Sequence, residues 1–216
     1  MLWTRAGSLV LLVVAFQVFV ARVALNKETK RRLQHSLTGH ALVQISYVLP
    51  RDMALALLVL GAAVIYILHQ FYPSKFRKAF GPLLRRHELT QLPGAFWFLV
   101  GTAATVLLVP DWTIIRYAVE CLALADPMAS WIGSTIRSPK VNAGSTVSGC
   151  VACFLTAIMV GKFMLSSPTN YTLSIGALAC TIAEVSPYGN DNLSIPILTA
   201  LVVYHWGDSR YPFSIF

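Results

Sequence analysis

A single carboxylate stands out in the apolar run 123–133, Ala-Leu-Ala-Asp-Pro-Met-Ala-Ser-Trp-Ile-Gly. On a helix, Asp126, Ala129, Ser130 and Gly133 share one face, because residues three, four and seven apart superpose. A charged side chain inside an apolar segment is costly unless it faces a polar cavity, a cation or a partner. The small neighbours leave room for a ligand to approach Asp126. The alternative is a helix–helix contact of small residues with Asp126 just outside the lipid.

A second acidic segment, 184–192, has the sequence Glu-Val-Ser-Pro-Tyr-Gly-Asn-Asp-Asn. Glu184 falls inside an apolar stretch, whereas Asp191 and Asn192 follow a Pro/Gly break. Irregular backbone at membrane depth is tolerated only where it lines a cavity. Together with Asp126, these oxygens suit a Mg²⁺ ion that bridges nucleotide phosphates. For Asp191 and Asn192 the alternative is a helix cap.

Two other segments suit phosphate groups. The adjacent Arg31 and Arg32 offer planar, permanently charged donors, although a juxtamembrane anchor on anionic lipid has the same composition. The segment 142–149, Asn-Ala-Gly-Ser-Thr-Val-Ser-Gly, precedes an apolar run, and a helix start there has free N–H groups for an anion. Ordinary N-capping by Ser145 or Thr146 is the alternative. Basic groups, a helix start and carboxylates together favour phosphoryl transfer from a nucleotide, with a carboxylate accepting the hydroxyl proton.

The composition indicates the elements that position these residues. Of the 216 residues, 56% are hydrophobic and 12% charged, and the mean hydropathy is +0.64. These values predict an all-α, polytopic membrane protein. We expect one integral membrane domain over 1–216, with 1–25 as first span and 26–196 as the core that carries the motifs. The expected spans are 8–25, 36–50, 53–73, 94–109, 113–134, 147–165, 173–187 and 193–208. Of these, 113–134 is interrupted at Asp126-Pro127 and 173–187 is interrupted after Glu184.

The distribution of charge supports eight spans. The first, third and fifth connections are basic, whereas the even ones are nearly neutral, so the odd connections are expected on the cytoplasmic face. This topology places the segments 26–35, 135–148 and 186–192 on one face, near Asp126. The net charge of +8 comes from short clusters between apolar runs, which does not favour nucleic acid as a partner. The N-terminal apolar run also resembles a signal peptide, but Arg22 interrupts the candidate cleavage site, which favours a retained span.

In this order, the motifs resemble those of the CTP-dependent lipid-alcohol kinases, which include the fungal-type diacylglycerol kinase, dolichol kinase and phytol kinase. The resemblance extends from about residue 28 to residue 196. The residues that carry it are Arg31, Arg32 and His35, then Asp126 and Gly133, then Thr146, Ser148 and Gly149, and finally Glu184, Asp191, Asn192, Ile195 and Pro196.

The resemblance implies CTP as phosphoryl donor, Mg²⁺ or another divalent cation, and a lipid alcohol within the bilayer as acceptor. It also implies an endoplasmic-reticulum or nuclear-envelope membrane, with the active site on its cytoplasmic face. It assigns catalysis and metal binding to Asp126, Glu184 and Asp191. The implied nucleotide- and phosphate-binding residues are Arg31, Arg32, His35, Gly133, Ser145, Thr146, Ser148, Gly149 and Asn192.

Two positions depart from the family pattern and bear on the acceptor. Ser145 stands where the family usually has lysine, and Ser148 where dolichol and phytol kinases commonly have glutamate. The second departure favours diacylglycerol, converted to phosphatidate, over dolichol, another polyprenol or phytol. Other possible functions are cytidylyl transfer to phosphatidate, a transporter with Asp126 and Glu184 as coupling carboxylates, and an inactive relative. Polar motifs that crowd one face, without an inverted repeat, argue against the transporter.

Overall fold

The computed structural model describes residues 15, 19–20, 22–81, 84–85, 88, 90–186 and 190–208. Apart from an isolated bridge between Lys140 and Thr146, the regular secondary structure of these residues is helical, which confirms the predicted all-α fold. The helices are α2 (Lys27–Ser46), α3 (Arg51–Phe71), α4 (Pro73–Phe80), α5 (Gly94–Leu108), α6 (Trp112–Thr135), α7 (Val147–Met164), α8 (Asn170–Val185) and α9 (Asp191–Trp206).

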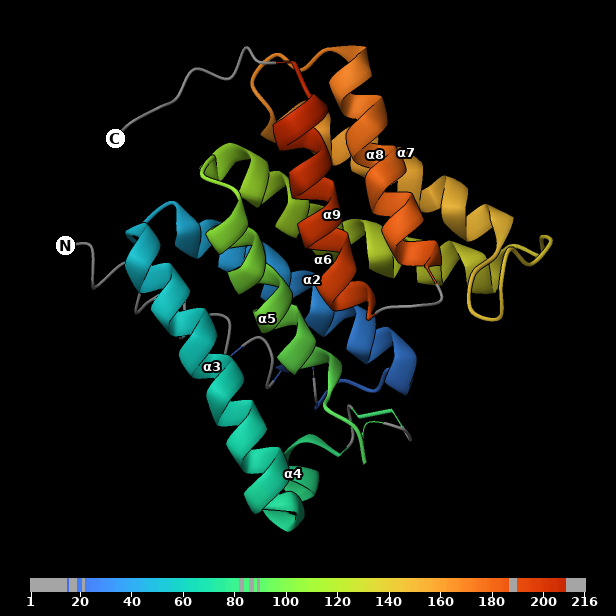
Figure 1. The fold of residues 1–216 in the computed structure, drawn as a ribbon. Helices are drawn as coiled ribbons and strands as arrows, with labels where there is room; N and C mark the ends of the chain where they lie inside the picture. Colours follow the sequence, from blue (N-terminus) through green and yellow to red (C-terminus); the bar gives the residue numbers. More distant parts are fainter. Residues whose placement is uncertain are drawn as a thin grey trace.

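Helix α6 forms the centre of the bundle (Figure 1). It packs against α2, α7 and α9, and its middle turns, from Tyr117 to Ala123, are almost completely buried. Gly39 of α2 allows the closest approach, because a Cβ at that position would lie under 3.0 Å from the Cβ of Ala123. The α2–α6 crossing therefore depends on one missing methyl group.

The expected spans from 53–73 to 193–208 coincide with α3 and α5–α9 to within three residues at either end. The expected span 8–25 lies mostly outside the described residues. The expectation for 36–50 was wrong at its start, because α2 begins at Lys27, where the side chain of Asn26 accepts the Thr29 N–H at 2.8 Å. Arg31 and Arg32 therefore lie on a helix and not in a connection.

The predicted interruption at Asp126-Pro127 was also wrong, since α6 continues through Pro127 to Thr135. A proline removes one intrahelical hydrogen bond and crowds the preceding turn. Pro127 is buried, and α6 is packed along most of its length, so tertiary contacts hold the helix across the proline. The predicted break after Glu184 does separate two helices, because α8 ends at Val185 and α9 begins at Asp191.

Among the described residues, α3 and α7 are long and apolar enough to cross a membrane. Only 17% of the apolar window of α3 and 28% of that of α7 is buried, so both helices lie at the outside of the bundle. The other helices fall short because α4, α5, α8 and α9 have fewer than 18 residues, and because charged and polar side chains make α2 and α6 less apolar. Large apolar side chains such as Leu60 and Phe163, 60% and 84% exposed, form an outer surface atypical of a soluble monomer.

Candidate active site

A polar cavity of about 540 Å³ lies where the start of α2, the end of α6, the start of α7, the end of α8 and the start of α9 meet. The segments predicted to share one membrane face therefore converge. The cavity is lined by Arg31, Arg32, Arg85, Asp126, Ala129, Ser130, Gly133, Ser134, Asn142, Ala143, Gly144, Ser145, Thr146, Gly149, Glu184, Ser186 and Asp191.

The two adjacent arginines of α2 are held in different ways. Arg32 donates from Nε to the hydroxyl of Ser130 at 3.1 Å and from Nη2 to the Ser130 carbonyl at 3.2 Å. Arg31 pairs with Glu28, with 2.8 Å between Nη2 and Oε1. The hydrogen bond from Arg31 lowers the pKa of Glu28 below its usual range, and the charges of Arg85 and Arg32 act in the same direction. The helical start of α2 thus points two guanidinium groups at the cavity.

Asp126 keeps its carboxylate available to the cavity. Its nearest charged or titratable neighbour from α2 is His35, with 3.6 Å between Nε2 and Oδ2, which is too long for a hydrogen bond. The Nε2–H of His35 donates instead to the Leu122 carbonyl at 2.9 Å. The side chain of Asp126 is 18% exposed. A carboxylate with this access, and with no hydrogen-bond partner in the part of the chain that the structure describes, is suited to accept a proton or a cation.

Glu184 and Asp191 bring further negative charge to the cavity. The hydroxyl of Ser145 donates to Oε1 of Glu184 at 3.4 Å, while Oε2 is buried and has no hydrogen-bond partner among the described residues. Asp191 precedes the expected span 193–208, and burial raises its pKa to about 7, with contributions from Asp126 and Glu184. A buried orphan oxygen and mutually repelling carboxylates are the features that a bound cation would stabilise.

These donors fit a cation in their chemistry, although they do not form a closed protein cage. Within the described ranges, no three His, Cys, Asp or Glu side chains are close enough to hold one ion. Mg²⁺ is typically bound through one or two carboxylates together with substrate phosphates and water. The cavity matches this mode better than a site with three protein carboxylates.

The start of α7 differs from the prediction. We expected free N–H groups there, but each early amide has a partner within the chain. The N–H of Val147 donates to the Pro139 carbonyl at 3.0 Å, that of Ser148 to the Ser138 hydroxyl at 2.9 Å, and that of Gly149 to the hydroxyl of Thr146 at 3.3 Å. The loop before the helix folds back on these amides and satisfies them. Binding of an anion therefore falls to the arginines and the hydroxyl groups.

Three residues from the predicted site lie outside the cavity lining. His35 stands beside Asp126, edge to face with Phe98 at 5.1 Å between ring centroids. The Ser148 hydroxyl receives a hydrogen bond from Ser138 at 2.8 Å and donates to a loop carbonyl. Asn192 donates from Nδ2 to the Gly94 carbonyl at 3.1 Å, which ties α9 to α5. The contacts of these three side chains therefore join α2, α7 and α9 to the helices and the loop beside them.

Sequence reasoning missed several lining residues, of which Arg85 is the most consequential. It belongs to the basic cluster before α5, which served only as a topology signal, and its Nη2 lies 3.9 Å from Oε1 of Glu28. Asn142 was predicted only as one residue of the segment 142–149. Its Oδ1 accepts the amides of Gly144 and Ser145 at 2.8 and 2.7 Å, and its Nδ2 donates to the Val185 carbonyl. An Asn-x-Gly turn signal was visible in the sequence.

Fold and site together define an all-helical protein with an apolar outer surface and a cavity in which guanidinium groups face carboxylates. None of the known protein-family models matches the chain. The chain is similar to an uncharacterized protein of Methanocaldococcus jannaschii, with 24% identity over 124 residues. The match covers 56% of this chain and 63% of the relative, less than two thirds of its length. No solved structure matches.

Proposed function

We propose that the chain is a membrane enzyme that transfers the terminal phosphoryl group of CTP to the hydroxyl of a lipid alcohol. The observation that carries the proposal is the composition of the polar cavity. Three arginines, three carboxylates and five hydroxyl-bearing side chains reach it from segments that are far apart in the sequence. Phosphoryl transfer depends on positioning and on stabilising negative charge, and this set of groups supplies both.

The roles follow from chemistry and position. Arg31, Arg32 and Arg85 bind phosphate oxygens, since guanidinium groups offer paired donors and keep their charge. Asp126 accepts the proton of the lipid hydroxyl. The hydroxyl oxygen then forms a bond to the γ-phosphorus, the bond from that phosphorus to the β-phosphate oxygen breaks, and CDP leaves.

Glu184 and Asp191 are the proposed cation ligands, together with the nucleotide phosphates. When bound, a divalent cation supplies positive charge that neutralises the triphosphate. The orphan Oε2 of Glu184 and the raised pKa of Asp191 support this assignment. Ser145 replaces the lysine usual in the resembled family, and Arg85 supports the proposal because it adds a positive charge to the same cavity.

The proposed setting is a membrane that the chain crosses several times, in the endoplasmic reticulum or nuclear envelope, with the cavity on the cytoplasmic face. The apolar outer sides of α3 and α7 and the basic third connection support it. Diacylglycerol is the first acceptor to test and dolichol the second. Because Ser148 lies outside the cavity lining, the choice between them rests on the family resemblance.

The test uses liposomes that contain the purified chain, with CTP and ATP compared as donors and with diacylglycerol and dolichol offered in parallel. We expect label from γ-phosphate, but not from α-phosphate, to enter the lipid together with release of CDP. Asp126→Asn should abolish transfer while the protein remains folded. Incorporation of α-label with pyrophosphate release would identify a cytidylyltransferase, and no labelled lipid from either donor would refute phosphoryl transfer to these alcohols.

A further inference from the structure

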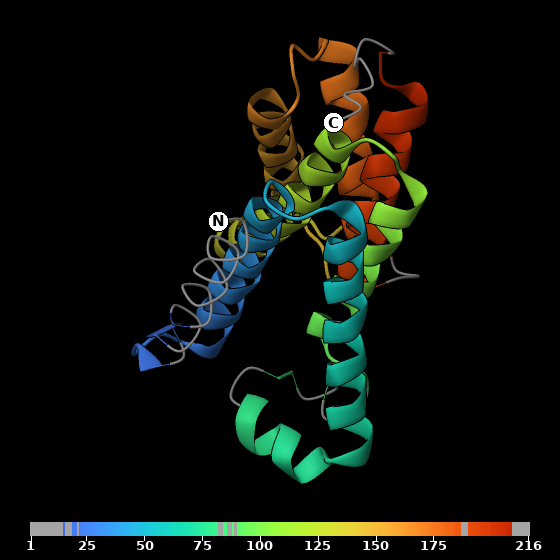
Figure 2. The ribbon, with the colours of Figure 1, turned by 90° about the vertical axis from the view of Figure 1, so that its left-hand side faces the viewer.

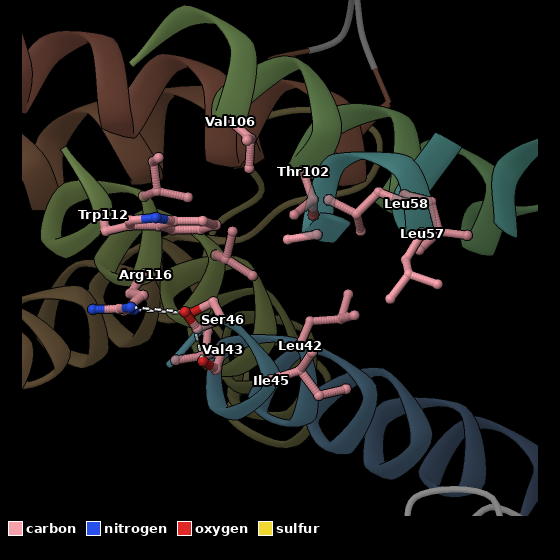
Figure 3. Close-up of a pocket in the computed structure, with 14 residues that line it drawn as sticks. Leu42, Val43, Ile45, Ser46, Leu57, Leu58, Thr102, Val106, Trp112 and Arg116 are labelled. Atoms are coloured by element: carbon pink, nitrogen blue, oxygen red, sulfur yellow. Dashed lines mark hydrogen bonds between the residues drawn. The ribbon is translucent and has the colours of Figure 1, made fainter. Parts of the chain in front are cut away.

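A second cavity, of about 210 Å³, lies between α2, α3, α5 and α6 (Figure 3). Leu42 and Ile45 of α2 face Leu57 and Leu58 of α3, with Trp112 of α6 at one side. This volume exceeds that of an engineered apolar cavity of about 150 Å³ that binds benzene. A cavity of this size and lining suits a hydrocarbon ligand.

The side chains of Arg116, Ser46 and Thr102 at the edge of this cavity have hydrogen-bond partners within the protein. Arg116 donates from Nε to the Ser46 hydroxyl and from Nη2 to the Ser46 carbonyl, both at 2.8 Å, and its guanidinium lies 3.7 Å from the ring centre of Tyr47. The hydroxyl of Thr102 donates to the Phe98 carbonyl at 2.8 Å. Nothing among these described groups demands a polar ligand, which again favours hydrocarbon.

The two cavities use the same faces of α2 and α6. Arg31 lines the polar cavity and Leu42, eleven residues later, lines the apolar one, so they lie on one face of α2. On α6, Val119 and Asp126 are two turns apart on one face and line the apolar and polar cavities respectively. At 1.5 Å per residue, the eleven residues on α2 span about 16 Å and the seven on α6 about 10 Å. Both lengths are within about half the bilayer hydrocarbon thickness of about 30 Å, which is about the depth that one lipid chain reaches.

The apolar cavity is also placed for entry from the bilayer. Figure 2 shows α2 and α3 diverging from the turn that joins them, and the cavity lies near that turn. Leu57, which lines the cavity, is 52% exposed, and Leu60 and Val64 continue an exposed apolar face along α3. This exposed face places the cavity within reach of a hydrocarbon chain from the surrounding bilayer.

We propose that this apolar cavity holds the distal hydrocarbon of the lipid alcohol whose hydroxyl is phosphorylated at Asp126. The inference rests on the proposed function and deepens it, because it makes chain length a determinant of substrate recognition. An alcohol with a chain too short to extend about 10 Å from Asp126 loses the contribution of the cavity.

The test is photocrosslinking, which needs no catalysis. A diacylglycerol with a diazirine at the end of one chain is incorporated into liposomes with the full chain, and labelled peptides are identified by mass spectrometry. We expect saturable labelling of the cavity-lining segments of α2, α3 and α6, competed by unlabelled diacylglycerol but not by phosphatidylcholine. Labelling spread evenly over the exposed faces of α3 and α7 would overturn the proposal.

Cavity-filling variants sharpen the test. Ala54 lines the cavity and is buried, whereas Ala63 on the same helix is exposed, so Ala54→Leu and Ala63→Leu form a matched pair. Each methylene of the lipid chain that is displaced from the cavity weakens lipid binding about fourfold. If the larger side chain of Ala54→Leu displaces two methylenes, specific labelling falls about tenfold or more. Labelling of Ala63→Leu should equal that of the wild type. Should Ala54→Leu not fold, Leu42→Phe fills the cavity from the opposite wall.

The outcomes separate the two proposals. Specific labelling without phosphoryl transfer in the wild type would refute the kinase and leave the hydrocarbon site standing. Transfer with equal labelling of folded Ala54→Leu and wild type would refute the hydrocarbon site and leave the kinase standing. With both correct, Ala54→Leu raises the KM for long-chain alcohols and leaves the KM for short-chain alcohols and kcat unchanged.

Discussion

The α2–α6 crossing offers the most direct test of the fold, through the substitution Gly39→Ala. A Cβ at residue 39 would lie under 3.0 Å from the Cβ of Ala123, 3.2 Å from its Cα and 3.1 Å from Cζ of Phe98. Carbon atoms pack best at about 3.5–4.0 Å, so the two helices must separate by more than about 0.5 Å. Overpacking of this kind costs about 1–3 kcal/mol, while alanine in place of glycine within a helix returns about 0.5–1 kcal/mol. We expect a net loss of about 1–2 kcal/mol.

A second substitution tests the same pair of residues, Gly39 and Ala123. Ala123→Gly alone should cost about 1–2 kcal/mol, from helix propensity and a lost buried methyl group. Combined with Gly39→Ala, it moves the methyl group from α6 to α2 and removes the closest contact. The double variant should therefore lie within about 1 kcal/mol of wild type, with a coupling energy of about 1–3 kcal/mol.

Unfolding of the purified variants in detergent, followed by helical circular dichroism against denaturant, measures these differences. Gly61→Ala is the control, because its added Cβ meets only the tip of the Leu99 side chain, at 3.1 Å, which can rotate away. Two results would show that α2 and α6 do not cross at this point. One is equal stability of Gly39→Ala and Gly61→Ala. The other is a double variant whose loss of unfolding free energy equals the sum of the losses in the two single variants.

Three further outcomes follow from the structure. His40→Ala removes the partner that lies 2.8 Å from the buried Glu120 and should lower the free energy of unfolding by about 1–3 kcal/mol. Adding Glu120→Gln to His40→Ala should restore part of this loss. Equal stability of the wild type, the single variant and the double variant would contradict this. Gly149→Ala places a Cβ 2.9 Å from the Ala129 carbonyl oxygen at the cavity wall and should lower both stability and phosphoryl transfer. Gly144→Ala is the control, because the nearest atom to its added Cβ is 3.8 Å away. Similar effects of the two substitutions would refute the close α6–α7 contact. Chelation of divalent cations should abolish transfer and added Mg²⁺ should restore it, whereas transfer that persists in chelator would exclude the proposed role of the cation.

Much of the helical framework was predictable because apolar run length and breaker residues determine where helices begin and end. The convergence at the polar cavity was predictable for a different reason. Alternation of charge between connections predicts which helix ends share a face, and it predicted that segments 26–35, 135–148 and 186–192 lie together. Lys27–Arg32 were mistaken for a connection because hydropathy alone was considered, although Asn26 and Glu28 are the usual signals of a helix start.

Other features depend on contacts that a linear pattern does not contain. The continuity of α6 through Pro127 arises from packing by α2, α7 and α9, and the occupied amides at the start of α7 arise from a loop that folds back through Ser138 and Pro139. The involvement of Arg85 likewise depends on where the segment before α5 returns to the bundle. Each is a tertiary contact that overrides a local signal.

The charge balance of the polar cavity links its two halves. The α2–α6 half provides Asp126 with two arginines, whereas the ends of α8 and α9 provide Glu184 and Asp191. A nucleotide triphosphate is attracted by the arginines and repelled by the carboxylates, so it gains from the second half only when a cation neutralises that half. A cation there would also relieve the repulsion by Asp126 and Glu184 that adds to burial in raising the pKa of Asp191. Nucleotide and cation should therefore bind with positive coupling, each strengthening the other to the same degree.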